Sequence, residues 1–526
     1  MSRRVAWLGP LAFIAALAIG WTQGHPGGAA TASAASAPPP NIVLIQTDDQ
    51  TDREFTRAVM PETKRLLADH GTTFSRYMVT TAECCPSRAS LLTGQYAHNH
   101  GVTSNQTAYP ALIDKGNVLP VWLHDAGYAT LHVGKFLNKY EDFADPPTQV
   151  APGWDKWYTI MGDAPYYNYD YFVNGTVQHR GVSDSDYVTR VLDRRATKLV
   201  DKYAPRRKPF FLELDERAPH TLRGRNRNDP CQRAHGAIPD PRDEGTLANV
   251  KLPRPASFNE KDLRDKPSFI RSQPLLSRQA KSQVKRRWEC ALESLRGVDR
   301  GVGRVFDAVR RSGELGRTVF LFVSDNGLFF GEHRIDDVKV LPYEEAIRVP
   351  FVMRVPKRYR HGAKRLAQSS APVANIDIAP TILQLAGATP CASPGDCRTM
   401  DGRSMLPILR RTGGFPGDRA LLTEYSRTDR GQSPVCVFDG VTTPGAIYVR
   451  YTSVVDPGTG SCEPSNAQER YDLSSDPREL SNLCFGGGSC PTDQRQADLA
   501  ARLTELADCA GIPGRDPVPA SGHYCE

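Results

Sequence analysis

The sequence lacks a strong charge of either sign. Its 66 Lys and Arg residues nearly balance 59 Asp and Glu residues, which leaves a net charge of +7 over 526 residues. Basic residues are spread along the chain beside acidic ones, so the composition does not indicate a nucleic-acid-binding protein, and we expect no nucleic acid partner. A modest preference for anionic substrates is compatible with the same charge.

Long apolar runs are also missing beyond the N-terminal region. The one candidate, Val5 to Gly20, follows Arg3 and Arg4 and precedes the small-residue stretch AATASAASA. This order predicts a signal peptide over residues 1–37, hence an exported or secreted protein with no stable membrane span after processing. The alternative is a retained membrane anchor, for which the apolar stretch is short.

Cysteines in paired Cys-x-x-Cys spacing are absent, which argues against a zinc site. Ten of the twelve cysteines lie outside the run CCPSR, and eight of those ten follow residue 390, in a Gly/Pro/Ser-rich region poor in hydrophobic runs. This distribution is typical of a crosslinked protein from an oxidising compartment. The short separations Cys391–Cys397 and Cys484–Cys490 favour local bridges, and the remaining pairing stays open.

Strands and helices alternate along the first 410 residues, which predicts an α/β sandwich on a mostly parallel sheet. The length favours a large domain over 38–410 and a small cysteine-rich domain over 411–526. The segment from about Arg223 to Gln279 has little periodicity, and we expect a surface excursion that is a candidate cover for the site. The expected strands are 42–45, 128–133, 210–214 and 318–323, and the expected helices are 61–70, 85–94, 118–126 and 288–311.

Polar side chains follow three of these strands. Asp48-Asp49 ends the first, the strand at Phe210 runs on towards His220, and Asp325-Asn326 ends the fourth. Ligands bind beyond the carboxyl ends of parallel strands, so three such ends predict a common site. The carboxylate and amide oxygens suit a hard divalent cation, calcium rather than magnesium. An Asp-Asp pair alone is more often a turn or a helix cap.

The run CCPSR combines cysteine with a helix start. Pro86 suits the first turn of a helix, which places Cys84 just before the helix N-terminus, where free N–H groups favour an anion. Arg88 adds a fixed positive charge. The alternative reading is that Cys84 and Cys85 are buried thiols or halves of disulfides.

CCPSRASLLTG resembles the signature of the type I, formylglycine-dependent sulfatases, in which the first Cys of Cys-x-Pro-Ser-Arg is converted to formylglycine. GKFLNKY, APH, VSDNG, YEEAIRVPFVMR, NIDIAPTILQLAG, DGRSMLPIL and YDLSSDPRELSNL follow in the family's order. The resemblance implies an alkaline-phosphatase-like sandwich with a smaller C-terminal domain. It also implies a formylglycine-generating enzyme as maturation partner and one calcium ion, held by Asp48, Asp49, Asp325, Asn326 and the formylglycine from Cys84.

The same resemblance assigns the remaining roles. Arg88 would stabilise the formylglycine and the metal site, Lys135 and Lys339 would grip the sulfate, and His220 would stand at the leaving-group oxygen. Hydrated formylglycine carries two hydroxyls on one carbon; one attacks sulfur, and deprotonation of the other regenerates the aldehyde. Taken singly, a lysine is usually a solvated surface charge and a histidine after a strand is usually structural.

Leu137 marks a departure, because many sulfatases carry a histidine there. GKFLN, CCPSR, HNHGV and YYNYDYFVNG instead resemble the N-acetylglucosamine-6-sulfatase branch. Asn138 is a candidate replacement contact, and His98, His100 and His333 have no assigned role. The predicted function is a sulfuric ester hydrolase acting on a sulfated carbohydrate. The alternatives are a broad arylsulfatase acting on aryl sulfates, a phosphonate monoester or phosphodiester hydrolase on the same scaffold, and a catalytically silent carbohydrate-binding relative.

Overall fold

A computed structural model describes residues 38–143, 149–162, 165–222, 226, 228–428, 433–486 and 488–526. The predicted signal peptide lies outside these residues. All described helices and strands belong to one compact unit, Pro39–Glu526. Within the described residues, no helix is long and apolar enough to cross a membrane.

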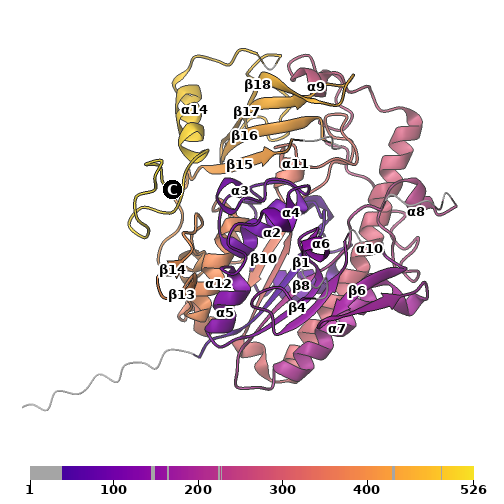
Figure 1. Cartoon of the computed structure of the whole chain (residues 1–526). Coiled ribbons are helices and arrows are strands. Elements are labelled where there is room, and N and C mark those ends of the chain that lie inside the picture. Colours follow the sequence, from indigo (N-terminus) through magenta and orange to yellow (C-terminus); the bar gives the residue numbers. More distant parts are fainter. Residues whose placement is uncertain are drawn as a thin grey trace, which may run out of the picture. The chain divides into compact units, whose positions relative to one another are not determined.

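A ten-stranded sheet forms the centre of the unit, in the order β11-β2-β10-β9-β1-β8-β4-β5-β6-β7 (Figure 1). The five strands from β9 to β5 are parallel, and β10, β6 and β7 pair antiparallel with their neighbours. The strands are β1 Asn41–Thr47, β2 Thr72–Phe74, β4 Ala129–Lys135, β5 Lys156–Ile160, β6 Tyr169–Val173, β7 Thr176–Arg180, β8 Phe210–Asp215, β9 Thr318–Ser324, β10 Phe351–Arg354 and β11 Gln368–Ser369.

The central strands are apolar throughout because both faces of the sheet are covered. Alternate residues of β1 point to opposite sides, so Ile42 and Leu44 join one hydrophobic core while Val43 and Ile45 join the other. The predicted α/β sandwich on a mostly parallel sheet is confirmed.

Helices cover both faces of this sheet (Figure 1). Those with residues in the core around Val43 include α7 and α10, and those in the core around Ile42 include α2, α5 and α12. The α-helices are α1 Pro61–Thr63, α2 Cys84–Thr93, α3 Ala97–His100, α4 Ala108–Ala111, α5 Leu119–Asp125, α6 Tyr140–Phe143, α7 Val188–Tyr203, α8 Pro230–Arg233, α9 Ser268–Arg271, α10 Arg278–Arg311, α11 Glu344–Ile347, α12 Ile378–Ala386, α13 Leu406–Arg410 and α14 Gln494–Leu506.

The C-terminal region builds a second sheet of four antiparallel strands, β15 Leu421–Ser426, β16 Val435–Thr443, β17 Ala446–Val455 and β18 Cys462–Asp472. Its apolar residues join the core around Ile42, so this region has more ordered hydrophobic packing than its composition suggested. The ten cysteines outside CCPSR pair, and both predicted local bridges are confirmed. The disulfides are Cys231–Cys290, Cys391–Cys397, Cys436–Cys462, Cys484–Cys490 and Cys509–Cys525.

Two expectations need correction. The long helix begins at Arg278 rather than near Trp288. The described residues of the excursion before it are not simply a surface loop: Lys266 is fully buried and donates hydrogen bonds to the Tyr471 hydroxyl and to the carbonyl oxygen of Glu479. This segment therefore helps to join the C-terminal sheet to the rest of the unit.

Candidate active site

The polar residues at two strand ends meet because β1 and β9 are parallel neighbours in register, with Thr47 opposite Ser324. The Asp49 backbone N–H donates to Asp325 Oδ1 at 3.1 Å, and Asn326 Nδ2 donates to Asp49 Oδ1 at 2.6 Å. The chain turns at Asp49 with φ of 71°, a left-handed conformation that Asp tolerates better than most residues. We call Asp48, Asp49, Asp325 and Asn326 the strand-end quartet; all four are at most 2% exposed.

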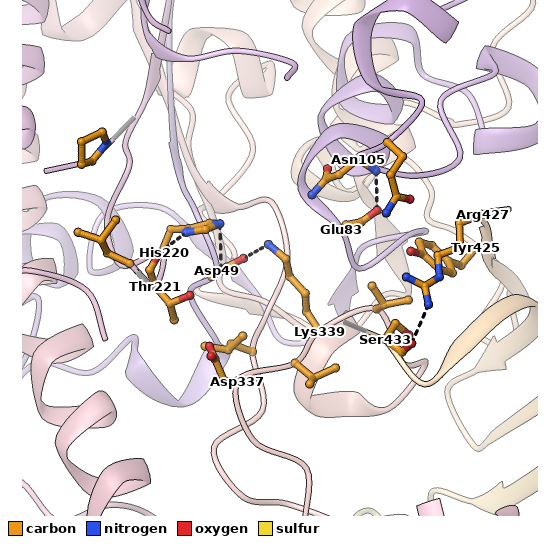
Figure 2. Close-up of a pocket in the computed structure, with 16 residues that line it drawn as sticks. Asp49, Glu83, Asn105, His220, Thr221, Asp337, Lys339, Tyr425, Arg427 and Ser433 are labelled. Atoms are coloured by element: carbon orange, nitrogen blue, oxygen red, sulfur yellow. Dashed lines mark hydrogen bonds and ion pairs between the residues drawn. The ribbon is translucent and has the colours of Figure 1, made fainter. Parts of the chain in front are cut away.

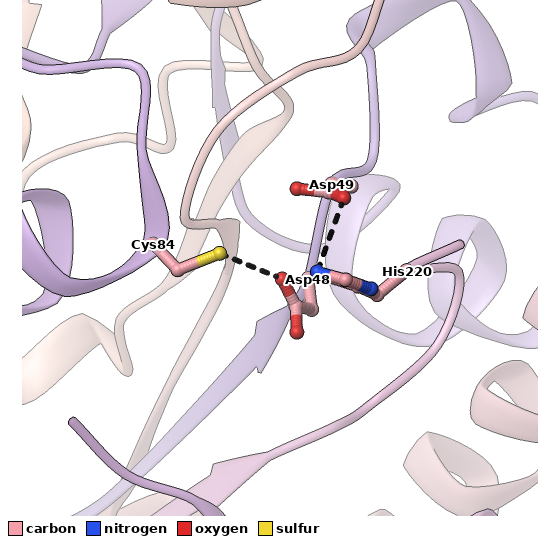
Figure 3. Close-up of side chains that lie close together, drawn as sticks. All are labelled: Asp48, Asp49, Cys84 and His220. Atoms are coloured by element: carbon pink, nitrogen blue, oxygen red, sulfur yellow. Dashed lines mark hydrogen bonds and ion pairs between the residues drawn. The ribbon is translucent and has the colours of Figure 1, made fainter. Parts of the chain in front are cut away.

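The helix α2 carries the cysteine pair to this quartet. Cys84 is the first residue of the helix, one position further in than the sequence indicated, and Glu83 is its N-cap. The Cys84 thiol lies 3.4 Å from Asp48 Oδ1 (Figure 3), and Lys339 Nζ approaches its sulfur to 2.9 Å. Cys85 instead belongs to the hydrophobic core. Only the first cysteine of CCPSR therefore faces the polar cluster.

Cationic side chains converge on the quartet. Arg88 Nε donates to Asp325 Oδ2 at 2.9 Å, Lys135 pairs with Asp48, and Lys339 Nζ donates to Asp49 Oδ1 at 2.6 Å. His220 Nε2 lies 3.7 Å from Asp49 Oδ2. The structure therefore brings all nine predicted site residues together: Asp48, Asp49, Cys84, Arg88, Lys135, His220, Asp325, Asn326 and Lys339.

Burial and these charges shift the proton affinities. Burial alone would raise the pKa of Asp48, but the neighbouring cations, with Lys135 the strongest, hold that pKa well below its ordinary value. Burial, reinforced by the Asp48 charge, raises the pKa of the Cys84 thiol well above its ordinary value. Burial, aided by Arg217, lowers the pKa of His220 to about 4. An unmodified Cys84 would thus be protonated near neutral pH and a poor nucleophile.

The quartet fits a hard divalent cation. It offers three carboxylates and an amide, which are oxygen ligands of the kind calcium takes. Among the described residues, Asn326 Oδ1 is buried and accepts no hydrogen bond, an arrangement that is unfavourable unless another group takes up the oxygen. Ligand atoms of Asp48, Asp49, Cys84 and His220 also lie within 4.8 Å of one another. The cluster can therefore hold a metal ion.

Three residues of the site were not predicted, two in this network and one, Arg427, on the wall of the adjoining cavity. Asp215, at the end of β8, accepts from Arg88 Nη1 at 3.0 Å and so holds Arg88 from the side opposite Asp325. Arg217 Nη1 lies 3.6 Å from Asp48 Oδ2. The sequence did hold a signal for Asp215 and Arg217, because both lie in the charged run at the end of β8, just before His220. The third, Arg427, had no signal, because it comes from the distant C-terminal sheet.

A cavity of about 810 Å³ opens beside the network (Figure 2). Asp49, His220 and Lys339 line one part of it, and Glu83, Tyr425 and Arg427 line another. No described residue of the 223–279 segment is among the lining residues, so the expectation that this segment covers the site finds no support there.

The histidines without an assigned role lie outside the cavity. His98 bonds to Glu424, His100 to Ser90 and His333 to Glu260. Leu137, which replaces the histidine that many sulfatases carry, is buried. The backbone N–H of Asn138 donates to the Cys85 sulfur at 3.1 Å.

Comparison with known proteins defines the class. A family model described as Sulfatase matches residues 40–388, and one described as N-sulphoglucosamine sulphohydrolase, C-terminal, matches residues 331–508. The chain belongs to the sulfatase family and is a sulfatase.

Its relatives identify the branch. N-acetylglucosamine-6-sulfatase of Capra hircus is 31% identical over 91% of this chain and 85% of its own length. The putative extracellular sulfatase Sulf-1 homolog of Caenorhabditis elegans is 33% identical over 70% of this chain, which spans about half (49%) of that protein. The predicted resemblance to the N-acetylglucosamine-6-sulfatase branch is confirmed.

Solved structures share the alkaline-phosphatase-like fold predicted for the chain. A protein solved in complex with its substrate D-glucosamine-2-N,6-O-disulfate superposes with a TM-score of 0.69 at 24% identity, over 89% of this chain and 97% of the other. The phosphonate monoester hydrolase of Agrobacterium radiobacter superposes with a TM-score of 0.60 at 18% identity, over 89% and 94%. The fold alone therefore does not distinguish between the two activities.

Proposed function

We propose that this sulfatase releases sulfate from a sulfate monoester of a carbohydrate, in the manner of a glucosamine-6-sulfatase, with formylglycine at position 84 and one calcium ion. The observation that carries the proposal is the meeting of Cys84 with the strand-end quartet and two lysines in one buried cluster at the edge of a cavity. The names of the relatives support a sulfated glucosamine as substrate.

Two groups complete the chemistry. The quartet, with residue 84, would hold the calcium ion, whose charge offsets that of the sulfate oxygens. Formylglycine would supply a hydrated aldehyde as nucleophile. The high pKa of the Cys84 thiol favours this modification over an ordinary cysteine mechanism, because a protonated thiol attacks poorly.

The chain's own residues bind and orient the sulfate. Lys135 and Lys339 would bind its oxygens from two sides, since each lysine stands beside one carboxylate of the quartet. Arg88 fixes Asp325 through its guanidinium and so positions the quartet. Charged groups preorganised in a buried site stabilise developing charge more strongly than they would in water.

His220 is placed to handle the leaving-group proton. Its Nδ1 is 2.7 Å from the carbonyl oxygen of Thr221, so Nδ1 carries a proton and donates it to that oxygen. Nε2 is then the ring atom left to face the leaving oxygen, in the cavity that His220 lines. It can give that oxygen a proton once the ring is protonated, a state that the negative charge of a bound sulfate would favour.

Export of the protein is part of the same proposal. The five disulfides fit an oxidising compartment, and one relative is named an extracellular sulfatase. A formylglycine-generating enzyme would convert Cys84 during export.

The test compares natively expressed wild type with Cys84→Ala and the matched control Cys85→Ala. We expect sulfate release from an aryl sulfate and from 6-sulfated N-acetylglucosamine in the wild type and the control, and none in Cys84→Ala. Mass spectrometry of the peptide holding Cys84 should show the aldehyde in place of the thiol. Full activity of Cys84→Ala would overturn the mechanism.

The second candidate is a phosphonate monoester or phosphodiester hydrolase, favoured only by the shared fold. The test compares the cleavage rates of a matched aryl sulfate, aryl phosphonate and aryl phosphodiester. Faster cleavage of either phosphorus ester than of the sulfate would favour this second candidate. Glycan binding without sulfate release, in protein that carries the aldehyde, would mean a catalytically silent relative.

A further inference from the structure

Arg427 is a buried cation on the wall of the reaction cavity. It directly follows β15, it is 3% exposed, and it lines the cavity together with Tyr425 and Ser433. In Figure 2, Arg427 and His220 stand on opposite sides of Lys339. The far part of the cavity therefore takes its positive charge from the C-terminal sheet, away from the strand-end quartet.

Among the described residues this guanidinium has no close counter-charge: the charge of Glu83 acts on it only from beyond ion-pair distance, and its Nε is buried without a hydrogen-bond partner. Its Nη2 donates to the carbonyl oxygen of Ser433 at 2.9 Å, and among the described residues no carboxylate lies within ion-pair distance of it. A buried charge without a directly hydrogen-bonded opposite charge is unfavourable. A guanidinium kept in this state beside a cavity is arranged to receive an anion from outside.

The backbone holds Arg427 in place. Its N–H donates to the carbonyl oxygen of Cys436 at 2.9 Å, and Cys436 is crosslinked to Cys462. The arginine is thus fixed before a ligand arrives, which reduces the entropy lost on binding.

The reacting sulfate does not need this charge. Lys135, Lys339 and Arg88 already surround the Cys84 cluster. The cavity of about 810 Å³ is in the upper part of the range, about 300–1,000 Å³, of sites for ligands larger than a single small group. It has room for a sugar ring that presents one anion to the quartet and another to Arg427.

We infer that Arg427 forms a second anion subsite, which binds a carboxylate or a further sulfate of the glycan whose sulfate ester is cleaved. This inference rests on the proposed function and narrows it to glycans that carry at least two anionic groups. A planar guanidinium suits both candidates, because it donates paired hydrogen bonds to carboxylate or sulfate oxygens.

The test measures specificity rather than activity alone. Three substrates share the 6-sulfate: N-acetylglucosamine-6-sulfate, glucosamine-6-sulfate with an N-sulfate in place of the acetyl group, and a disaccharide of N-acetylglucosamine-6-sulfate and a uronic acid, which adds a carboxylate. The variants are Arg427→Met, Arg427→Lys and the control Arg450→Met, which alters an arginine of β17 that does not line the cavity.

We expect the wild type to prefer one of the two-anion substrates, and the preferred one identifies the second group. In Arg427→Met, kcat/KM for that substrate relative to the single-anion sugar should fall about tenfold or more, mainly through KM, because a charge-assisted hydrogen bond is lost. Arg427→Lys should keep part of the preference, and Arg450→Met should keep all of it. Rising ionic strength should weaken the preference in the wild type more than in Arg427→Met.

A wild type without preference for a second anion, or a preference unchanged in Arg427→Met, would overturn the subsite alone. Sulfate release from aryl sulfate but from none of the three sugars would overturn the proposed carbohydrate substrate, and the subsite with it. Circular dichroism and thermal unfolding of each variant separate a specificity change from misfolding.

Discussion

Replacing Arg88 by methionine should destabilise the protein strongly. The Arg88 side chain is 4% exposed and joins two buried carboxylates, Asp325 through Nε at 2.9 Å and Asp215 through Nη1 at 3.0 Å. Methionine has a similar volume, so the change removes charge with little loss of packing. Breaking a buried ion pair by removing one partner destabilises a protein by about 3–5 kcal/mol, because the other charge is left uncompensated.

That magnitude can be measured directly. With an unfolding entropy of about 2.1 cal/mol/K per residue, a chain of this length loses roughly 1 °C of melting temperature per kcal/mol, so we expect a drop of about 3–5 °C. Scanning calorimetry and urea unfolding in calcium-containing buffer provide the two readouts. Sulfate release should fall as well, because Arg88 positions the strand-end quartet.

The matched experiment also removes one of the two carboxylates that lose their ion-pair partner in Arg88→Met. In Arg88→Met/Asp215→Asn, only Asp325 is left without its partner, so the double variant should regain at least about 1 kcal/mol relative to Arg88→Met. Asp215→Asn alone should cost less than Arg88→Met, since it leaves the Arg88–Asp325 pair intact. A melting temperature of Arg88→Met equal to that of the wild type, or a double variant less stable than Arg88→Met, would refute this account of the network.

Three further predictions concern other parts of the molecule. Calcium at 100 times its Kd should stabilise the wild type by about 2.7 kcal/mol in thermal unfolding, but it should not stabilise Asn326→Leu, which lacks the amide oxygen. Equal stabilisation of both proteins would show that Asn326 is not a calcium ligand. Gly134→Ala should give little folded protein, because Gly134 has φ of 120° and an added Cβ would overlap the carbonyl oxygen of Asp215; wild-type yield and urea midpoint would contradict this close approach. His98→Ala should lose more stability at about pH 6 than at about pH 9.5. Burial lowers the pKa of His98, but the charge of Glu424 outweighs burial and raises that pKa to about 9. The ion pair therefore stabilises the fold fully below the unfolded pKa of about 6.5, and this stabilisation is lost as pH rises through the folded pKa. Equal losses in urea unfolding at both pH values would show that the pair is not ionised.

The parts that the sequence predicted well are those with local signals. The apolar run of β1, the helix that contains CCPSR and its end at Gly94, and the polar residues at strand ends are all encoded within a few neighbouring positions. Family motifs then placed Lys135, Lys339 and His220, which no local pattern would distinguish from ordinary surface residues.

The parts that were missed depend on which distant surfaces pack together. Arg427 reaches the cavity only because the C-terminal sheet packs beside it, and no pattern around residue 427 encodes that contact. Lys266 is buried for the same reason, in a segment whose polar composition is typical of an exposed loop. The contact of Asp215 was not predicted because its side chain binds Arg88 and does not line the cavity.

The burial of Cys84 would impose an order of events on the proposed conversion of this residue. The side chain is 1% exposed, and the cluster around it requires Asn326 to meet Asp49, 277 residues earlier in the chain. A chain synthesised from its N-terminus exposes Cys84 long before β9 exists. An enzyme that converts Cys84 would therefore have to reach it before β9 pairs with β1. The proposed conversion and folding would then compete, and a molecule that folded first would keep its thiol.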